Sequence, residues 1–471
     1  MDVLDLTRLQ FAVVTIYHYL FVPLSICLSA AAAGLHLTWL RTRAERHLLL
    51  TKFVGKLLIV TFAVGVVTGL VQEFQFGLGW SAFAKFYGDV FGPTLAVEGM
   101  LAFFLEATFL ALWYFGWDRL PRKVHAATIV VVAAGTLLSA YIILAGNSFM
   151  QNPVAYALDP VTGRAHLTSF GELLTNEVVL AAFPHTMAGA AMAGGGLLLA
   201  IGVWRLAADR AFRTLARLGA WLMLVGGALT AITGDHLGKV MTAVQPMKMA
   251  AAEALYETTT GAPFSVLAIG RLGHEKPFLT IEIPHLLSLL GTGSFGGTVQ
   301  GIDDLQAQYT AQFGPGSYVP MIPVAFWTFR LMIGAGVAGM ALAAYYLWVS
   351  SERTWRLPLL PAFLQMGAGV PGWTKRILLL SPLLPAAANT FGWIFTETAR
   401  QPWLAFGISK VSDGISPGLT SAEVLLSLGG FTLVYGLLAV AWYKLVVHLS
   451  RKPLAPEPAG RPADAEPVPA Y

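Results

Sequence analysis

The sequence has 471 residues, of which 56% are hydrophobic and only 12% are charged. Average soluble domains carry about 25% charged residues, so the composition excludes an ordinary soluble protein and predicts that most of the chain lies in lipid. The net charge of +4 comes from basic residues spread between apolar segments, so no nucleic-acid surface is predicted. The single cysteine, Cys27, excludes disulfides, cysteine-based zinc sites and iron–sulfur clusters within this chain.

Nine apolar runs of about twenty residues follow one another along the chain, and this length crosses a bilayer as a helix. The sequence therefore predicts an all-α integral membrane protein of about nine transmembrane helices packed in bundles. The first run follows Met1 and Asp2 without a basic leader or a cleavage site, so we expect it to be retained. The predicted spans are residues 11–39, 53–76, 92–116, 125–146, 177–204, 213–237, 323–349, 377–398 and 420–446.

The connections between the spans differ in charge. Those after the first, third, fifth and seventh spans carry clusters of lysine and arginine, such as Arg41, Arg119, Arg205 and Arg353, whereas the alternate short connections carry few. Cytoplasmic loops are enriched in Lys and Arg. We therefore expect a multi-pass protein with its N-terminus outside and its C-terminus in the cytoplasm.

A long polar segment, residues 239–322, separates the sixth and seventh spans, and the topology places it outside. Loops of this length usually carry a function. The loop divides the chain into residues 1–238, with six spans, and residues 323–450, with three. Residues 451–471 are rich in Pro, Ala and charge, which is typical of a disordered tail, here cytoplasmic and without chemistry.

Several side chains inside the spans are costly enough in lipid to indicate function. His18, His185 and Met332 each lie about nine residues into a span that enters from outside, roughly 13 Å deep at 1.5 Å per residue. Glu98 is shallower, and Glu397 lies at the outer end of its span. Histidine and methionine can both ligate haem iron. The alternatives are a histidine that only hydrogen-bonds a neighbouring helix and a methionine that only fills a gap in the core.

Two further pairs have a defined spacing. Glu98 and Glu106 share one span and lie roughly 12 Å and about 80° apart on a straight α-helix, which favours an ion or proton path over a structural pair. Trp393 and Glu397 share a helix face. The tryptophan could flank a bound macrocycle or belong to an aromatic belt at the membrane surface.

The local sequence closely resembles subunit I of the cytochrome bd quinol oxidases along nearly the whole chain. Several of the matching strings are long and specific. They are RLQFAVVTIYHYLFVPL from Arg8, TKFVGK from Thr51, EFQFGLGW from Glu73, GDVFGPTLAVEGMLAFFLEATF from Gly88, FGWDRL from Phe115, MQNP from Met150, FPHT from Phe183, FRLM from Phe329 and GWIFTETARQPW from Gly392.

The resemblance implies an electrogenic quinol:oxygen oxidoreductase of a bacterial cytoplasmic membrane. Such an enzyme oxidises quinol on the outer side and reduces O2 to water with cytoplasmic protons, which generates a proton motive force without pumping. The resemblance also implies that His185 and Met332 are the axial ligands of a low-spin haem b558. His18 and Glu397 then each ligate one of two high-spin haems, with haem d preferred at His18 and haem b595 at Glu397.

The resemblance extends to residues around these ligands. Glu98 is expected next to the oxygen-reducing haem. From the spacing of the two acids we expect Glu106 on a proton path from the cytoplasm to this haem, with Ser139 as a neighbouring polar group between the acids; the alternative is that Glu106 only pairs with a group on the partner subunit. Arg330 and Arg400 are expected to meet haem propionates or a carboxylate, which arginine binds well.

The outer loop is similar to the family's quinol-binding loop. In QPMKMAAAEALYET, Lys248 and Glu253 match positions expected to handle quinol, with Glu253 as the proton acceptor. Without the resemblance, both would be read as exposed residues of a loop helix. Ala399 replaces the glycine of the family's GRQPW string, which puts the positioning of the Glu397 segment in doubt. A homologous membrane subunit II is the expected partner, with small single-helix subunits as further candidates.

Two rival functions remain open at this point. A secondary transporter could use Glu98, Glu106 and Glu397 to couple ions, and a related oxidase could carry only b-type haems. The spans contain no copper-site pattern, which disfavours a haem–copper oxidase. The sequence does not distinguish ubiquinol from menaquinol.

Overall fold

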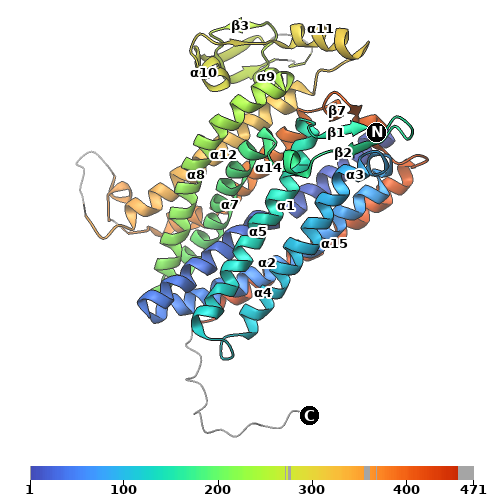
Figure 1. The fold of residues 1–471 in the computed structure, drawn as a ribbon. Helices are drawn as coiled ribbons and strands as arrows, with labels where there is room; N and C mark the ends of the chain where they lie inside the picture. Colours follow the sequence, from blue (N-terminus) through green and yellow to red (C-terminus); the bar gives the residue numbers. More distant parts are fainter. Residues whose placement is uncertain (1, 271, 274–276, 355–360, 368, 455–471) are drawn as a thin grey trace, which may run out of the picture.

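The computed structural model describes residues 2–270, 272–273, 277–354, 361–367 and 369–454. Within these ranges, nine helical segments are long and apolar enough to cross a membrane, and they lie side by side in one elongated bundle (Figure 1). The predicted all-α membrane architecture with about nine spans is confirmed. Seven spans are single helices: α1 (Val3–Thr42), α2 (Glu45–Leu78), α5 (Arg122–Gln151), α7 (Glu177–Trp204), α8 (Ala211–Val244), α12 (Ile322–Val349) and α15 (Ser421–Arg451).

The helices extend beyond most of the apolar runs that predicted them, and polar side chains cap the first turns of α1 and α15. Asp2 caps α1, since its Oδ1 accepts a hydrogen bond from the backbone N of Asp5 at 2.7 Å. Thr420 and Glu423 form a capping box at the start of α15. The predicted tail starts within the last turn of α15, and residues 455–471 lie outside the described part of the chain.

The third span contains a π-helical segment that the sequence analysis did not predict. It consists of α3 (Ser81–Val97), the π-helix Glu98–Phe103 and α4 (Phe104–Phe115). π-Helical turns inside α-helices are frequent at functional sites, and this one begins at an acid inside a span. Because the segment changes the helical phase, the angle expected between Glu98 and Glu106 on a straight α-helix does not apply.

The eighth span is also interrupted. It consists of α13 (Gly372–Leu378) and α14 (Leu383–Thr398), whereas the sequence predicted one run over residues 377–398. Pro382 lies in the break, and proline cannot donate a backbone hydrogen bond. The hydroxyl of Ser381 donates to the carbonyl of Gly196 on α7 at 2.9 Å, so a neighbouring span supplies a partner at the break.

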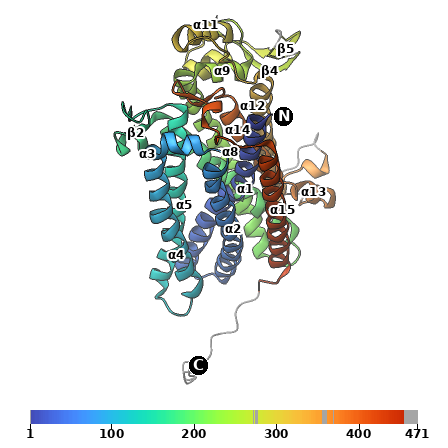
Figure 2. The same ribbon diagram turned by 90° about the vertical axis from the view of Figure 1, so that its right-hand side faces the viewer.

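Helix α7 lies at the centre of the bundle. Within the described chain, 83% of its most apolar window is buried, compared with 11% for α15, which lies at the edge of the bundle in both views (Figures 1 and 2). Glycines allow α7 and α8 to pack closely, as small residues do between membrane helices. A Cβ atom built on Gly219 of α8 would lie 2.4 Å from the backbone N of Leu199 and 2.6 Å from the carbonyl O of Gly195.

The segment between α8 and α12 forms a cap over one end of the bundle (Figure 1). Its core joins α9 to the start of α12 and to the segment after α14, through residues that include Met247, Ala251, Phe326 and Trp403. The cap contains α9 (Pro246–Glu253), α10 (Leu286–Thr292), α11 (Ile302–Phe313) and two antiparallel pairs, β3 (Thr259–Thr260) with β6 (Thr298–Val299) and β4 (Phe264–Ile269) with β5 (Leu279–Ile283).

Short elements at the same end lie beside the cap (Figure 1). They carry aromatic and aliphatic side chains that pack on α3 and on the end of α5. They are the antiparallel pair β1 (Tyr156–Leu158) and β2 (Ala165–Leu167), helix α6 (Phe170–Leu174), the antiparallel pair β7 (Trp403–Ala405) and β8 (Ser409–Lys410), and the 3-10 turn Val411–Gly414. A separate 3-10 turn, Ala362–Leu364, lies between α12 and α13.

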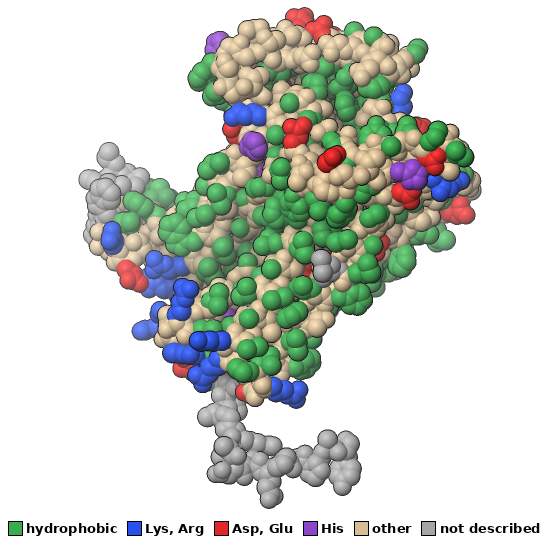
Figure 3. Space-filling model, viewed as in Figure 1, with side chains coloured by type: hydrophobic (Ala, Val, Ile, Leu, Met, Phe, Trp, Pro, Cys, Tyr) green, Lys and Arg blue, Asp and Glu red, His purple; other side chains and the backbone are tan. Residues whose placement is uncertain are grey.

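Lysine and arginine side chains gather at the end of the bundle away from the cap (Figure 3). This end includes the α1–α2 and α7–α8 connections. The distribution agrees with the charge pattern from which the orientation was predicted.

Gly219→Ala should separate α7 from α8, because the atoms that a new Cβ would meet are backbone atoms that cannot rotate away. We expect a loss of about 1–3 kcal/mol in stability, seen as a lower thermal unfolding midpoint in detergent. Gly436→Ala on α15 is the matched control, since a Cβ there meets nothing within 4 Å. Equal midpoints for the two variants would contradict this packing.

Candidate functional site

His185 on α7 is oriented by α8. Its Nδ1 lies 3.1 Å from the carbonyl O of Thr230. A carbonyl can only accept, so Nδ1 carries the proton and Nε2 keeps its lone pair, a tautomer assigned from this contact. A Cβ on Gly234 would lie 3.1 Å from Cε1 of the ring. The glycine thus makes room for the imidazole, and the free Nε2 can ligate a metal.

His18 on α1 is held in the same way by α2. Its Nδ1 lies 3.0 Å from Oγ1 of Thr68, whose hydroxyl donates back to the carbonyls of Val64 and Gly65. The threonine oxygen therefore accepts from the ring, and Nε2 is again left free. A Cβ on Gly69 would lie 3.0 Å from Cε1. Metal-binding histidines usually donate their other ring N–H to such a partner, so both histidines have the orientation that ligation requires.

Met332 on α12 places its sulfur against α14. A Cβ on Gly392 would lie 2.8 Å from Sδ, so glycine is the residue that lets the thioether approach the α14 backbone. Helix α14 also contacts α7, where the side chain of Asn389 donates to the carbonyl of Gly189 at 3.4 Å. Helices α7, α8, α12 and α14 thus form one packed group that carries both His185 and Met332.

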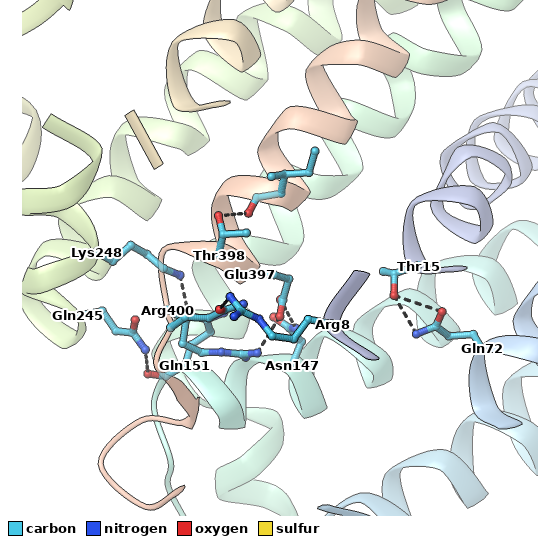
Figure 4. A network of polar contacts seen from close by, with 12 residues as sticks. Arg8, Thr15, Gln72, Asn147, Gln151, Gln245, Lys248, Glu397, Thr398 and Arg400 are labelled. Carbon is cyan, nitrogen blue, oxygen red and sulfur yellow. Dashed lines mark hydrogen bonds and ion pairs between the residues drawn. The ribbon is translucent and has the colours of Figure 1, made fainter. Parts of the chain in front are cut away.

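Glu397, at the end of α14, has a partner for each carboxylate oxygen. Asn147 of α5 donates to Oε1 at 2.9 Å, and Arg400 donates to Oε2 at 2.7 Å (Figure 4). One turn before it, the ring of Trp393 stacks on Tyr19 of α1, with 5.3 Å between centroids and 7° between planes. Tyr19 directly follows His18 in the chain. Trp393 therefore packs between α14 and α1 near His18 and does not belong only to a lipid-facing aromatic belt.

Arg400 has unused hydrogen-bonding capacity. Its side chain is 6% exposed, yet within the described ranges its Nε and Nη1 have no hydrogen-bond partner. A buried cation with open donors is an attractive site for a carboxylate. Arg400 also lines a small cavity together with Lys248, Tyr309 and Gln401, which lies between α9 and the segment after α14.

The end of α5 connects the cap to this segment (Figure 4). Gln151 accepts a hydrogen bond from Nζ of Lys248 at 2.6 Å, and its backbone carbonyl accepts from the side chain of Gln245 at 2.6 Å. Asn147, which donates to Glu397, lies one turn earlier on the same helix. The sequence analysis did not select Asn147 or Gln151, although their i, i+4 spacing at the end of a span was a usable signal.

Lys248 and Glu253 are both buried, with 2% and 4% of the residue exposed, so the alternative of exposed loop residues is wrong. Burial, together with the nearby charge of Arg400, lowers the pKa of Lys248 to about 7, while Glu397 opposes the shift. Burial raises the pKa of Glu253 to about 7, against the opposing charge of Arg330. Both side chains can therefore exchange protons near neutral pH.

Arg330 of α12 reaches the cap. Its Nη2 lies 2.8 Å from Oε2 of Glu253, and the two side chains are 8% and 1% exposed. The expectation that Arg330 meets a haem propionate remains a prediction.

The two acids of the third span contact α5 at neighbouring positions. The hydroxyl of Ser139 donates to Oε1 of Glu98 at 2.7 Å, so the serine expected as a polar group between the two acids contacts the outer one. Glu106 faces Gly135 instead, because a Cβ there would lie 2.8 Å from its Cγ. Its Oε1 is buried and has no hydrogen-bond partner among the described residues. One face of α5 thus contacts both acids.

The chain matches the family model of the cytochrome bd terminal oxidase subunit I over residues 6–454. It belongs to the cytochrome bd oxidase subunit I family. It is 38% identical to the cytochrome bd ubiquinol oxidase subunit 1 of Bacillus subtilis, over 96% of this chain and 94% of that protein. It is 31% identical to the cytochrome bd-II ubiquinol oxidase subunit 1 of Escherichia coli, over 96% of each. The structure of bd oxidase from Geobacillus thermodenitrificans is similar with a TM-score of 0.84, at 27% identity, over 96% of this chain and 98% of that one.

Membership makes this bd-family chain a multi-pass subunit of a terminal quinol oxidase, in a family that carries haem. Among the described residues, no group of three or more His, Cys, Asp or Glu could hold a bare metal ion. A haem needs only one or two axial ligands from the protein, because the macrocycle supplies the others. The separate positions of His18, His185, Met332 and Glu397 fit that requirement.

Glu253 should make the docking of α9 depend on pH. Its pKa is raised from 4.5 to about 7, so the stability it contributes is present below the lower value and is lost as pH rises through the upper one. After correction for intrinsic exchange, α9 amides should exchange hydrogen faster at about pH 7 than at about pH 5. Glu253→Gln should flatten this profile. An equally steep profile in the variant would show that another group is responsible.

Proposed function

We propose that this subunit oxidises quinol at the cap, on the outer side of a bacterial cytoplasmic membrane, and supports reduction of O2 to water with protons from the cytoplasm. Release and uptake of protons on opposite sides separates charge without a pump. The observation that carries the proposal is the matched orientation of His18 and His185. Each is held through Nδ1 by the neighbouring helix, and each keeps Nε2 for a metal.

The donor set supports three haem positions. His185 and Met332 are proposed as the ligands of the low-spin haem b558, with His18 and Glu397 at the two high-spin haems, preferably d and b595 respectively. When bound, these groups supply electron transfer and oxygen chemistry. Two nitrogens of Arg400, Nε and Nη1, have no partner among the described residues and are open to a propionate or another carboxylate.

Quinol oxidation is assigned to Lys248 and Glu253. Oε2 of Glu253 is occupied by Arg330, while Oε1 is buried and has no hydrogen-bond partner in the described part of the chain. Oε1 is therefore the atom that can accept a quinol proton. A base with a pKa near the working pH is effective in this role. Lys248 can donate to a quinol oxygen. Relatives are named as ubiquinol oxidases and, at 25% identity, as a putative menaquinol oxidase, so the substrate class is quinol.

Proton delivery from the cytoplasm is assigned to Glu106, with Glu98 as the outer acceptor and Ser139 hydrogen-bonded to it. The open oxygen of Glu106 fits a group that exchanges protons with water or with a further side chain. A homologous subunit II is the proposed partner, and small single-helix subunits are further candidates. A secondary transporter using the same acids is disfavoured because the chain belongs to the bd family.

Met332→Leu tests the low-spin site. It removes the sulfur at similar volume, so the loss of stability should stay below about 1.5 kcal/mol. We expect the low-spin b-type absorbance to become high-spin or to vanish, with other haem retained. Met340→Leu, on the same helix but packed against Gly227, is the matched control and should leave the spectrum unchanged. An unaltered low-spin spectrum in Met332→Leu would remove the assignment.

Glu106→Gln tests the proton path. The amide keeps the shape of the side chain but cannot exchange a proton, so haem loading should persist while turnover falls by roughly tenfold or more. The membrane potential generated per electron should fall as well. The measurement is oxygen consumption together with potential in proteoliposomes. Near-normal turnover with full potential would leave Glu106 as a structural residue.

A further inference from the structure

We propose that Arg330 is the positioning residue of the quinol site: it docks the cap on α12 and holds the carboxylate of Glu253 with one oxygen occupied and the other open. This inference rests on the proposed role of Glu253 as the base. It assigns to Arg330 a task at the quinol and not at a haem propionate.

The guanidinium of Arg330 has five N–H donors, and the structure accounts for all five. Nε donates to the carbonyl of Ser265 at 2.8 Å, and Nη1 donates to the carbonyls of Phe326, at 3.2 Å, and Ala252. Nη2 donates to Oε2 of Glu253 at 2.8 Å and to the carbonyl of Ser265. Three of these acceptor residues belong to the cap, in α9 and β4, so one side chain of a span binds two cap elements together.

The environment of the guanidinium favours this arrangement. Its central carbon lies 3.5 Å from the ring centroid of Phe326, one turn earlier on α12, so an aromatic face covers the cation while its edge faces the cap. The arginine and glutamate side chains are 8% and 1% exposed. A buried charge without its partner is strongly disfavoured. The cap therefore depends on this contact more than on an ordinary surface ion pair.

The geometry at Glu253 gives the contact a chemical consequence. Oε2 accepts from Arg330 and from the backbone N of Ser265, at 2.8 and 3.2 Å. Oε1 has no partner. Because the carboxylate is held by one oxygen, the other has a fixed position from which to accept a proton. Loss of the arginine would free the carboxylate to rotate and would loosen α9 around it.

A propionate role for Arg330 would predict a different result. No N–H of the guanidinium is left for another acceptor in this structure, and four of its five hydrogen bonds go to the cap, so binding a propionate would compete mainly with contacts to the cap. Met332 lies two residues further, about 200° around the helix. A change at Arg330 can therefore alter the cap while the sulfur stays in place.

The test uses the purified haem-loaded complex with the variants Arg330→Gln and Arg330→Lys. The control is Arg213→Gln, which also removes an arginine but lies at the end of α8 that is far from the cap. Three quantities are measured: hydrogen exchange of residues 246–254, quinol-supported turnover with its KM, and the reduced low-spin spectrum. For Arg330→Gln we expect α9 exchange to rise at least about tenfold and quinol turnover to fall by about tenfold or more. The spectrum and the turnover driven by an artificial one-electron donor should not change.

Arg330→Lys keeps the charge but not the planar guanidinium, so hydrogen exchange of α9 should lie between the rates of the wild type and Arg330→Gln. If Arg330→Gln does not fold, the lysine variant still allows the measurement. Unchanged α9 exchange in both variants would overturn the proposal, as would loss of the low-spin spectrum with α9 exchange at the control value. The exchange measurement does not need quinol turnover. A wild-type complex that does not oxidise quinol would therefore refute the proposed function, while α9 exchange would still decide whether Arg330 anchors the cap.

Discussion

Hydrocarbon offers no water to polar side chains, so an ionisable group inside a span must take its partner from a neighbouring helix. This constraint organises the bundle. Thr68 of α2 orients His18, Thr230 of α8 orients His185, and Ser139 of α5 holds Glu98. Each contact uses one polar atom of the side chain and leaves another open. The same interactions that satisfy the fold therefore prepare lone pairs and carboxylate oxygens for ligation and proton transfer.

The cap depends on the bundle in the same way. Lys248 donates to Gln151 at the end of α5, and Glu253 pairs with Arg330 of α12. Both contacts are buried, so the cap is joined to the spans by polar interactions that water does not weaken. The two attachment points belong to different helices, which fixes the position of α9 over the bundle. A quinol bound between them would meet groups whose pKa values lie near neutrality.

Hydropathy predicted the nine spans because about twenty apolar residues are required to cross lipid, whatever the tertiary structure. It did not predict the capped extensions, the π-helix at Glu98 or the break near Pro382, which depend on local hydrogen bonds and neighbouring helices. The candidate ligands could be predicted from residue type and from the family strings, but their tautomers could not. The burial of Lys248 and Glu253 was missed because the burial of loop residues depends on packing between distant segments.

We propose that the neighbouring helices orient His18 and His185 for haem iron. The most direct measurement is the absorbance spectrum of the purified subunit with its partner, followed by extraction of the pigments. We expect bound haem, with a low-spin b-type band and a red-shifted band from a d-type macrocycle. A correctly folded but colourless preparation would contradict it.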